Sequence, residues 1–181
     1  MSFIELVKSR RSLRDYSDFS VERAVIEECL EAARLAPSAC NSQPWYFIVV
    51  DDPVLKDRLA AAAFSGVYSM NSFAGAAPVL VALVRQRSCV PARVGGFLKG
   101  TQFNLIDTGI AAEHFCLAAA ERGLGTCMLG WFNGRAAKKI LEVGRADKIE
   151  LLISLGRPKN NWPDQRPRKP LNEFRGFNLN R

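Results

Sequence analysis

The chain has 181 residues, of which 48% are hydrophobic, so it can bury the core of one ordinary domain and is not composed like a disordered protein. Its net charge of +7 allows three kinds of anionic partner: nucleic acid, a membrane surface or a phosphate-bearing small molecule. No basic helical stripe interleaved with aromatic residues occurs, which argues against nucleic acid. The longest apolar runs, Trp45–Val50 and Pro78–Val84, are too short to cross a bilayer, and the N-terminus lacks the apolar run of a secretory signal.

Cysteine and histidine usage argues against a metal centre. The five cysteines are odd in number and form no C-x-x-C pair, and His114 is the only histidine. Reduced, buried thiols in a cytoplasmic protein are the simplest interpretation, and we predict no metal. His114 lies in an apolar helical pattern, which favours a structural role over that of a catalytic base.

A basic segment follows the first predicted helix, Ser2–Ser9. Arg10, Arg11 and Arg14 surround the hydroxyl of Ser12, and such a cluster repels itself unless an anion or carboxylates lie between the guanidinium groups. Arginine suits phosphate because its planar fork donates two parallel hydrogen bonds. A solvated basic turn is the alternative.

The next predicted helix runs from Val21 to about Leu35 with Ser20 as its N-cap, and Pro37 ends it. The stretch 36–45 (APSACNSQPW) then joins it to a strand at Trp45–Val50. This loop is either an ordinary helix-to-strand connection or a ligand loop that presents its hydroxyl, amide and backbone groups. Because Trp45–Val50 is apolar on both faces, we expect it to be interior to a sheet.

The remaining elements have clear boundaries at several positions. After the first strand we predict a helix capped by Asp52 that ends at about Ala63, an irregular stretch Phe64–Ala76 and a strand Pro78–Val84. A mobile excursion, Arg85–Gly100, then leads to a long helix, Thr101–Arg122, with Gly123 at its C′ position. The last predicted elements are a strand Thr126–Leu129, a helix from Asn133 to Val143 and a strand Ile149–Leu155. The tail from about 158 to 181 is rich in Pro, Asn and Arg and cannot bury itself, so it is either frayed or docked on a partner. No repeat or earlier boundary divides the chain, so we expect one domain over 1–181.

Taken together, the segments 10–14 (RRSLR) and 36–45 resemble the nitroreductase family of flavoproteins. Two further segments agree with this resemblance, which covers essentially the whole chain in the right order: 123–130, with GLGTC and then Leu129-Gly130, and 166–170 (RPRKP). The resemblance implies an α+β fold with a central, mostly antiparallel sheet flanked by helices. It also implies an intertwined homodimer with two FMN sites at the interface, in which the C-terminal arm extends onto the partner.

The resemblance assigns cofactor-binding roles to particular residues. Arg10 and Ser12 would contact the phosphate or ribityl chain, Arg14 would lie near the pyrimidine edge of the flavin, and Arg11 falls at a position that the family also uses. The other matched positions are Pro37, Ser38, Ala39 and Asn41 from the other subunit's loop, Asn71 at the polar edge of the ring, the backbone of Leu129 and Gly130 near N5, and Arg166 and Arg168 at the phosphate. No side chain is predicted to be catalytic, because the flavin carries the chemistry.

The activity implied by the resemblance is a ping-pong reaction in which hydride passes from NAD(P)H through flavin N5 to a nitroaromatic, a quinone or a similar acceptor. Phe64–Phe73 and Arg85–Gly100 are the segments expected to shape the acceptor pocket. Other flavin reactions of the same fold remain alternatives, namely flavin fragmentation, dehalogenation and azoline oxidation. A third alternative is a protein that stores or senses FMN without turnover, and a fourth is a basic protein that binds nucleic acid.

Overall fold

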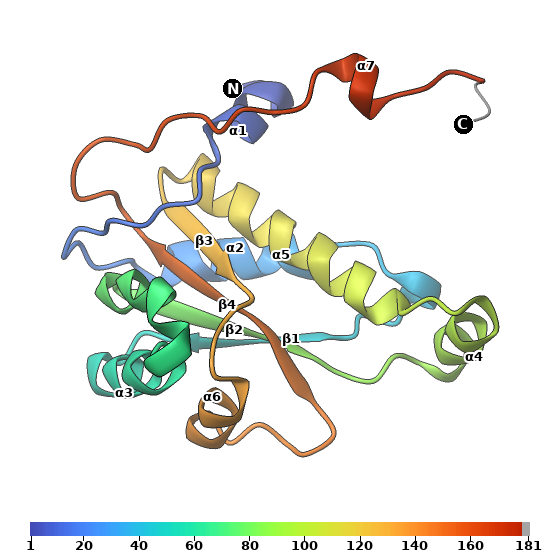
Figure 1. Ribbon diagram of the computed structural model, residues 1–181, viewed down its shortest axis with the longest axis horizontal. Helices are drawn as coiled ribbons and strands as arrows, with labels where there is room; N and C mark the ends of the chain where they lie inside the picture. Colours follow the sequence, from blue (N-terminus) through green and yellow to red (C-terminus); the bar gives the residue numbers. More distant parts are fainter. Residues whose placement is uncertain (179–181) are drawn as a thin grey trace.

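Four antiparallel strands form the centre of the molecule, in the spatial order β1-β2-β4-β3 (Figure 1). Their bounds are β1 Trp45–Val50, β2 Val79–Arg85, β3 Gly125–Leu129 and β4 Lys148–Gly156. The computed structural model describes residues 1–178. The predicted α+β class with an antiparallel sheet is confirmed.

Helices cover both faces of the sheet, as expected. The helical elements are α1 Phe3–Ser9, α2 Arg23–Arg34, η1 Ala39–Asn41, α3 Pro53–Ala63, η2 Gly66–Ala76, α4 Val90–Lys99, α5 Phe103–Glu121, α6 Gly134–Ile140 and α7 Leu171–Phe174. Residues of α2 and α5 pack against one face, and residues of α3, η2 and α6 pack against the other. The long helix α5 runs along the sheet, while α4 stands apart at its N-terminal end (Figure 1).

The strand β2 explains why the core has two layers. Successive side chains of a strand point to opposite faces, so Leu80, Ala82 and Val84 join the core beneath α3 and α6. The alternate residues Val79, Val81 and Leu83 join the core beneath α2 and α5. A strand buried on both sides therefore reads as an uninterrupted apolar run.

The prediction that Trp45–Val50 is interior to the sheet is wrong. Within residues 1–178, β1 pairs with β2 alone and forms an edge of the sheet. Its side chains still contact apolar layers on both faces, because Phe47 and Val49 pack on the α5 side and Ile48 on the α3 side. A strand that is apolar on both faces is therefore one that helices cover on both sides of the sheet. Its apolar pattern does not indicate how many strands lie next to it.

Two other predicted elements need correction. α2 begins at Arg23 with Glu22 as its N-cap, two residues later than a cap at Ser20 requires. The segment Arg85–Gly100 contains the helix α4, where the prediction was a mobile excursion. Proline is tolerated in the first turn of a helix, so Pro91 marks the start of α4 and does not mark a loop.

Several predicted caps are confirmed. The Asp52 carboxylate accepts from the Leu55 amide at the start of α3, and the Asn133 side chain accepts from the Ala136 amide at the start of α6. Gly123, after α5, has a φ of +69°, as a C′ glycine should. Within residues 1–178, no helix is long and apolar enough to cross a membrane.

Candidate functional site

The basic N-terminal segment is docked against the free edge of β3. The Leu13 amide donates to the Thr126 carbonyl at 2.9 Å, and Ser12 forms a parallel bridge with Thr126. Leu13 is only 2% exposed and lies directly over Gly125, where an added Cβ would meet its side chain at 2.5 Å. Since side chains alternate along an extended segment, burying Leu13 turns its neighbours Ser12 and Arg14 outward.

The start of the C-terminal tail runs beside the residues that follow this basic segment. The Ser17 amide donates to the Arg157 carbonyl at 3.0 Å, and the Lys159 amide donates to the Asp15 carbonyl at 3.2 Å. These bonds bring the tail across the N-terminal segment, and Figure 1 shows the two running close together above the sheet.

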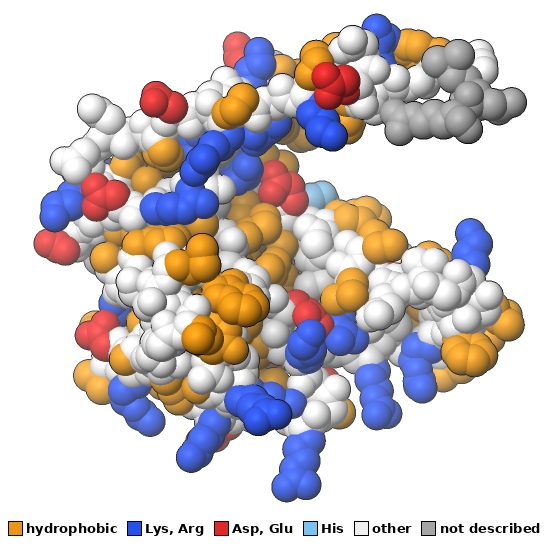
Figure 2. Space-filling view, in the orientation of Figure 1, with side chains coloured by type: hydrophobic (Ala, Val, Ile, Leu, Met, Phe, Trp, Pro, Cys, Tyr) orange, Lys and Arg blue, Asp and Glu red, His pale blue; other side chains and the backbone are white. Residues whose placement is uncertain are grey.

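A cavity of about 500 Å³ lies where the two ends of the chain meet. Its lining includes Arg10, Arg11, Ser12 and Arg14 from one end and Arg166 and Arg168 from the other, together with Lys8, Glu113 and Asp164. The structure therefore brings together six of the predicted site residues. Six cations face two carboxylates, an excess that suits an anion with more than one negative charge. Figure 2 shows Lys and Arg side chains gathered beneath the tail.

Arg10 is held in this cavity by an ion pair. Its Nε lies 3.3 Å from Glu113 Oε1, and Glu113 projects from α5. Glu113 and Lys8 line the cavity but were not predicted as site residues. Neither lies in a recognisable sequence motif, and only the packing of α1 and α5 beside the basic segment places them there.

Arg14 connects the cavity to the predicted ring-binding residues. Its guanidinium carbon lies 5.8 Å from the centre of the Phe73 ring, and Phe73 follows Asn71 by two residues on η2. The Asn71 Nδ2 donates to the Trp131 carbonyl at 2.8 Å, next to Gly130. Arg14 of the basic cavity therefore contacts the helix η2 that carries Asn71, and Asn71 bonds to the residue after Gly130.

Leu129 and Gly130 lie at the end of β3. The Leu129 side chain is 4% exposed and belongs to the core beneath α3 and α6, so it has no side chain to offer a ligand. Gly130 lines a separate cavity of about 430 Å³ beside α6. The expectation that Leu129 contributes only through its backbone agrees with this burial.

The loop with Pro37, Ser38, Ala39 and Asn41 lies apart from the basic cavity and lines no part of it. It is held from two sides by other elements. The Ala39 amide donates to Asp107 Oδ1 on α5 at 3.2 Å, and Ser42 Oγ accepts from the Cys89 amide at the start of α4 at 2.7 Å. The sequence analysis did not identify Asp107. The one feature that could have pointed to it is that an acidic residue lies on the face of α5 that the apolar pattern predicts to be buried.

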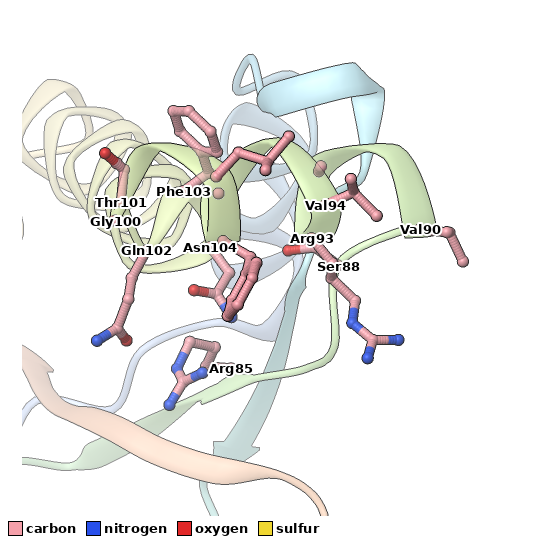
Figure 3. A pocket seen from close by; sticks show the side chains of 14 residues that line it. Arg85, Ser88, Val90, Arg93, Val94, Gly100, Thr101, Gln102, Phe103 and Asn104 are labelled. Carbon is pink, nitrogen blue, oxygen red and sulfur yellow. The ribbon is translucent and has the colours of Figure 1, made fainter.

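Another cavity, of about 850 Å³, lies between α4, the end of β2 and the start of α5. Arg85, Arg93 and Gln102 point to the same side below α4, and Phe103 and Val94 are among the apolar lining residues (Figure 3). It contains none of the predicted cofactor residues. The cations converge on the smaller cavity, and the larger cavity lies in a segment expected to shape the acceptor pocket.

The titratable groups of the core offer no activated nucleophile. Burial raises the pKa of the Cys116 thiol to about 12, and burial also raises the pKa of Cys127. His114 Nδ1 lies 3.1 Å from the Ala32 carbonyl and so links α5 to α2. Within the described residues, no group of three or more His, Cys, Asp or Glu side chains is placed to hold a metal ion.

Comparison with known proteins shows the family of this chain. The sequence model of the Nitroreductase family matches residues 7–69 and 67–157. An Archaeoglobus fulgidus protein, provisionally named NADH dehydrogenase/NAD(P)H nitroreductase, is 31% identical in an alignment that covers 87% of this chain and 86% of that protein. Pig iodotyrosine deiodinase 1 is 29% identical over 95% of this chain and 67% of its own length.

Solved structures share the fold over nearly the whole chain. A nitroreductase family protein from Clostridium novyi superposes with a TM-score of 0.77 at 32% identity, covering 88% of each chain. An FMN-dependent nitroreductase from Clostridium difficile superposes with a TM-score of 0.77 at 26% identity, covering 98% of this chain and 99% of that one.

Proposed function

Because the chain belongs to the nitroreductase family, we propose that it is an FMN-dependent oxidoreductase that uses NADH or NADPH to reduce an electron-poor acceptor such as a nitroaromatic or a quinone. The observation that carries this proposal is the convergence of the two basic clusters from opposite ends of the chain on one cavity. When bound, FMN would supply hydride-transfer chemistry between the nicotinamide and the acceptor, in a ping-pong cycle.

The residues of the chain have the chemistry that FMN requires. A phosphate with two negative charges needs several cations, and Arg10, Ser12, Arg166 and Arg168 supply charge-assisted donors around one cavity. Arg14 leads from there toward η2, where a cation near the pyrimidine edge would stabilise the anionic reduced flavin.

Asn71 suits the polar edge of the flavin for a related reason. Its Nδ2 is already bonded to the Trp131 carbonyl, so the Oδ1 remains to accept a hydrogen bond from a ring N–H. The backbone at Leu129 and Gly130 continues the path from there. The order of these residues, with cations first and amide groups beyond, follows the order of phosphate, ribityl chain and ring in FMN.

We propose that the working form is a homodimer. The loop with Ser38, Ala39 and Asn41 lines no part of the cavity, so a second copy is needed to bring this loop to the same flavin. Apolar side chains of α1 and the tail lack cover within the chain: Phe3 is 67%, Leu171 66% and Phe174 77% exposed. A second copy that covers these side chains would also give the arm at 158–181 its docking surface.

Dehalogenation is the second candidate activity, and one observation favours it. Pig iodotyrosine deiodinase 1 is similar over 95% of this chain. Both activities need the same cofactor site, so they differ only in the acceptor that the segments Phe64–Phe73 and Arg85–Gly100 admit.

The test is anaerobic absorbance spectroscopy of the purified full-length chain after incubation with FMN and removal of the free cofactor. Flavin bands that bleach with NADH or NADPH and recover repeatedly with menadione or nitrofurazone are the expected result. A chain that retains no FMN would refute the proposal. A chain that retains FMN but passes no electrons to any acceptor would favour the storage or sensing alternative.

Arg14→Ala tests the site assignment within the same experiment. Loss of one charge-assisted contact in a partly exposed site should weaken FMN binding about tenfold and slow reduction by the nucleotide. Arg58→Ala, on the exposed side of α3, is the matched control and should change neither quantity. Normal affinity and a normal reduction rate in the Arg14 variant would remove Arg14 from the site.

A further inference from the structure

We propose that Asp107 is a positioning residue for the flavin reaction, and that it acts by holding the loop 37–43 in a left-handed conformation. This inference rests on the proposed function for its consequence, but its structural part concerns only contacts within the chain. Asp107 lies on α5, which packs beside this loop, and it contacts neither the basic cavity nor the large cavity below α4.

The loop has an unusual backbone. Cys40, Asn41 and Gln43 have φ values of 53°, 51° and 44°, in the left-handed region that is costly for residues other than glycine. Such conformations persist only where surrounding contacts determine them, and they cluster at functional sites. The loop therefore needs anchors outside itself.

Three contacts from outside tie the loop down: the Cys89 thiol donates weakly to the Cys40 carbonyl at 3.9 Å, and two stronger bonds act as anchors. The first is Ser42 Oγ, which accepts from the Cys89 amide at 2.7 Å and ties the loop to the start of α4. The second is Asp107 Oδ1, which accepts from the Ala39 amide at 3.2 Å. Ala39 immediately precedes the first left-handed residue, so the Asp107 bond fixes the direction in which the loop enters that conformation.

The burial of Asp107 supports this role. The residue is 4% exposed, and its Oδ2 has no hydrogen-bond partner within the described part of the chain. Burying a carboxylate with one unsatisfied oxygen costs folding free energy. An alanine at this position of α5 would favour the helix and remove that cost, so packing alone gives no reason for an aspartate here. The acceptor for the Ala39 amide is the contribution that an apolar residue cannot make.

The test compares Asp107→Ala with Asp107→Asn, which keeps an oxygen to accept from the Ala39 amide. Thr108→Val is the control, because Thr108 is the buried neighbour on α5 and bonds only to the Asn104 carbonyl of its own helix. The first measurement is hydrogen–deuterium exchange of the Ala39 amide in the chain without added FMN. The second is the FMN dissociation constant from quenching of flavin fluorescence.

We expect Asp107→Ala to speed exchange at Ala39 and to weaken FMN binding by about 10- to 100-fold, because the Ala39 amide loses its acceptor. Asp107→Asn and Thr108→Val should stay within about threefold of the wild type in both measurements, a difference well below 1 kcal/mol. Unfolding midpoints in urea should show that Asp107→Ala is no less stable than Thr108→Val, which separates positioning from a merely structural role.

Two results would overturn the inference. One is wild-type exchange and FMN affinity in Asp107→Ala, and the other is a defect in Asp107→Asn as large as that in Asp107→Ala. If the alanine variant does not fold, Asp107→Leu keeps the branched shape without the acceptor and takes its place. A wild-type chain that binds no FMN would refute the proposed function, whereas the exchange measurement at Ala39 would still decide whether Asp107 anchors the loop.

Discussion

Replacing Gly125 with alanine should disturb stability and cofactor binding together, because this glycine is where the basic segment docks on the sheet. The new Cβ would lie 2.5 Å from Leu13 Cδ2 and 2.8 Å from Leu13 Cβ. Ordinary carbon–carbon contacts are about 3.5–4.0 Å. A rotamer change can move the Cδ2 atom, but it cannot move Leu13 Cβ, so the backbone near Leu13 must retreat by roughly 1 Å.

The size of the effect follows from this geometry. Overpacking of a tight core contact costs about 1–3 kcal/mol, and replacing glycine in a strand returns about 0.5–1 kcal/mol. A net loss of about 1–2 kcal/mol is therefore expected for Gly125→Ala. The same retreat shifts Ser12 and Arg14, which flank Leu13, so FMN affinity should fall by about tenfold.

Urea unfolding without FMN and fluorescence titration with FMN measure the two effects separately. Gly95→Ala is the matched control, since nothing lies within 4 Å of a Cβ added there and alanine favours the interior of α4 by about 0.5–1 kcal/mol. A lower urea midpoint in Gly125→Ala with unchanged FMN affinity would refute the reasoning that docking of Leu13 aligns the basic segment. An unchanged midpoint would refute the steric argument itself.

Two other predictions concern charge and thiols. Burial opposes ionisation of Glu150, but hydrogen bonds from Arg85 and Lys148 outweigh it and hold the pKa of this carboxyl below its usual value. A carboxyl with a lowered pKa contributes stability that is fully present above its unfolded pKa and is lost as the pH falls through its folded pKa. Glu150→Gln should therefore cost about 1 kcal/mol at neutral pH, and its urea midpoint should decline less steeply toward acid than that of the wild type. Parallel curves of urea midpoint against pH for the two proteins would contradict this. In the native protein, the Ellman reagent should label the exposed Cys40 first and the half-buried Cys89 more slowly. The buried thiols should react only on unfolding, namely Cys29, Cys116 and Cys127. Burial raises the pKa of Cys29 to about 11, so labelling of Cys29 as fast as Cys40 would show that the core opens in the native protein.

The sequence by itself determined most of the helices and strands, although it missed α4. The two buried strands, the Asp52 and Asn133 caps and the glycine after α5 follow from local patterns, because burial and capping depend on residues within a few positions of one another. The arginine cluster at 10–14 indicates either an anion site or a solvated basic turn, and only the family resemblance assigns Arg166 and Arg168 to the same phosphate.

The tertiary structure decided which of these features meet. It made β1 an edge strand although its side chains are apolar on both faces, since the sequence cannot distinguish cover by helices from pairing with strands. It brought Arg10 and Arg166 to one cavity through backbone bonds between residues 15–17 and 157–159. It also placed Asp107 beneath the Ala39 amide, 68 positions away along the chain. Contacts across such separations depend on how helices and strands pack around the sheet, and no local pattern encodes them.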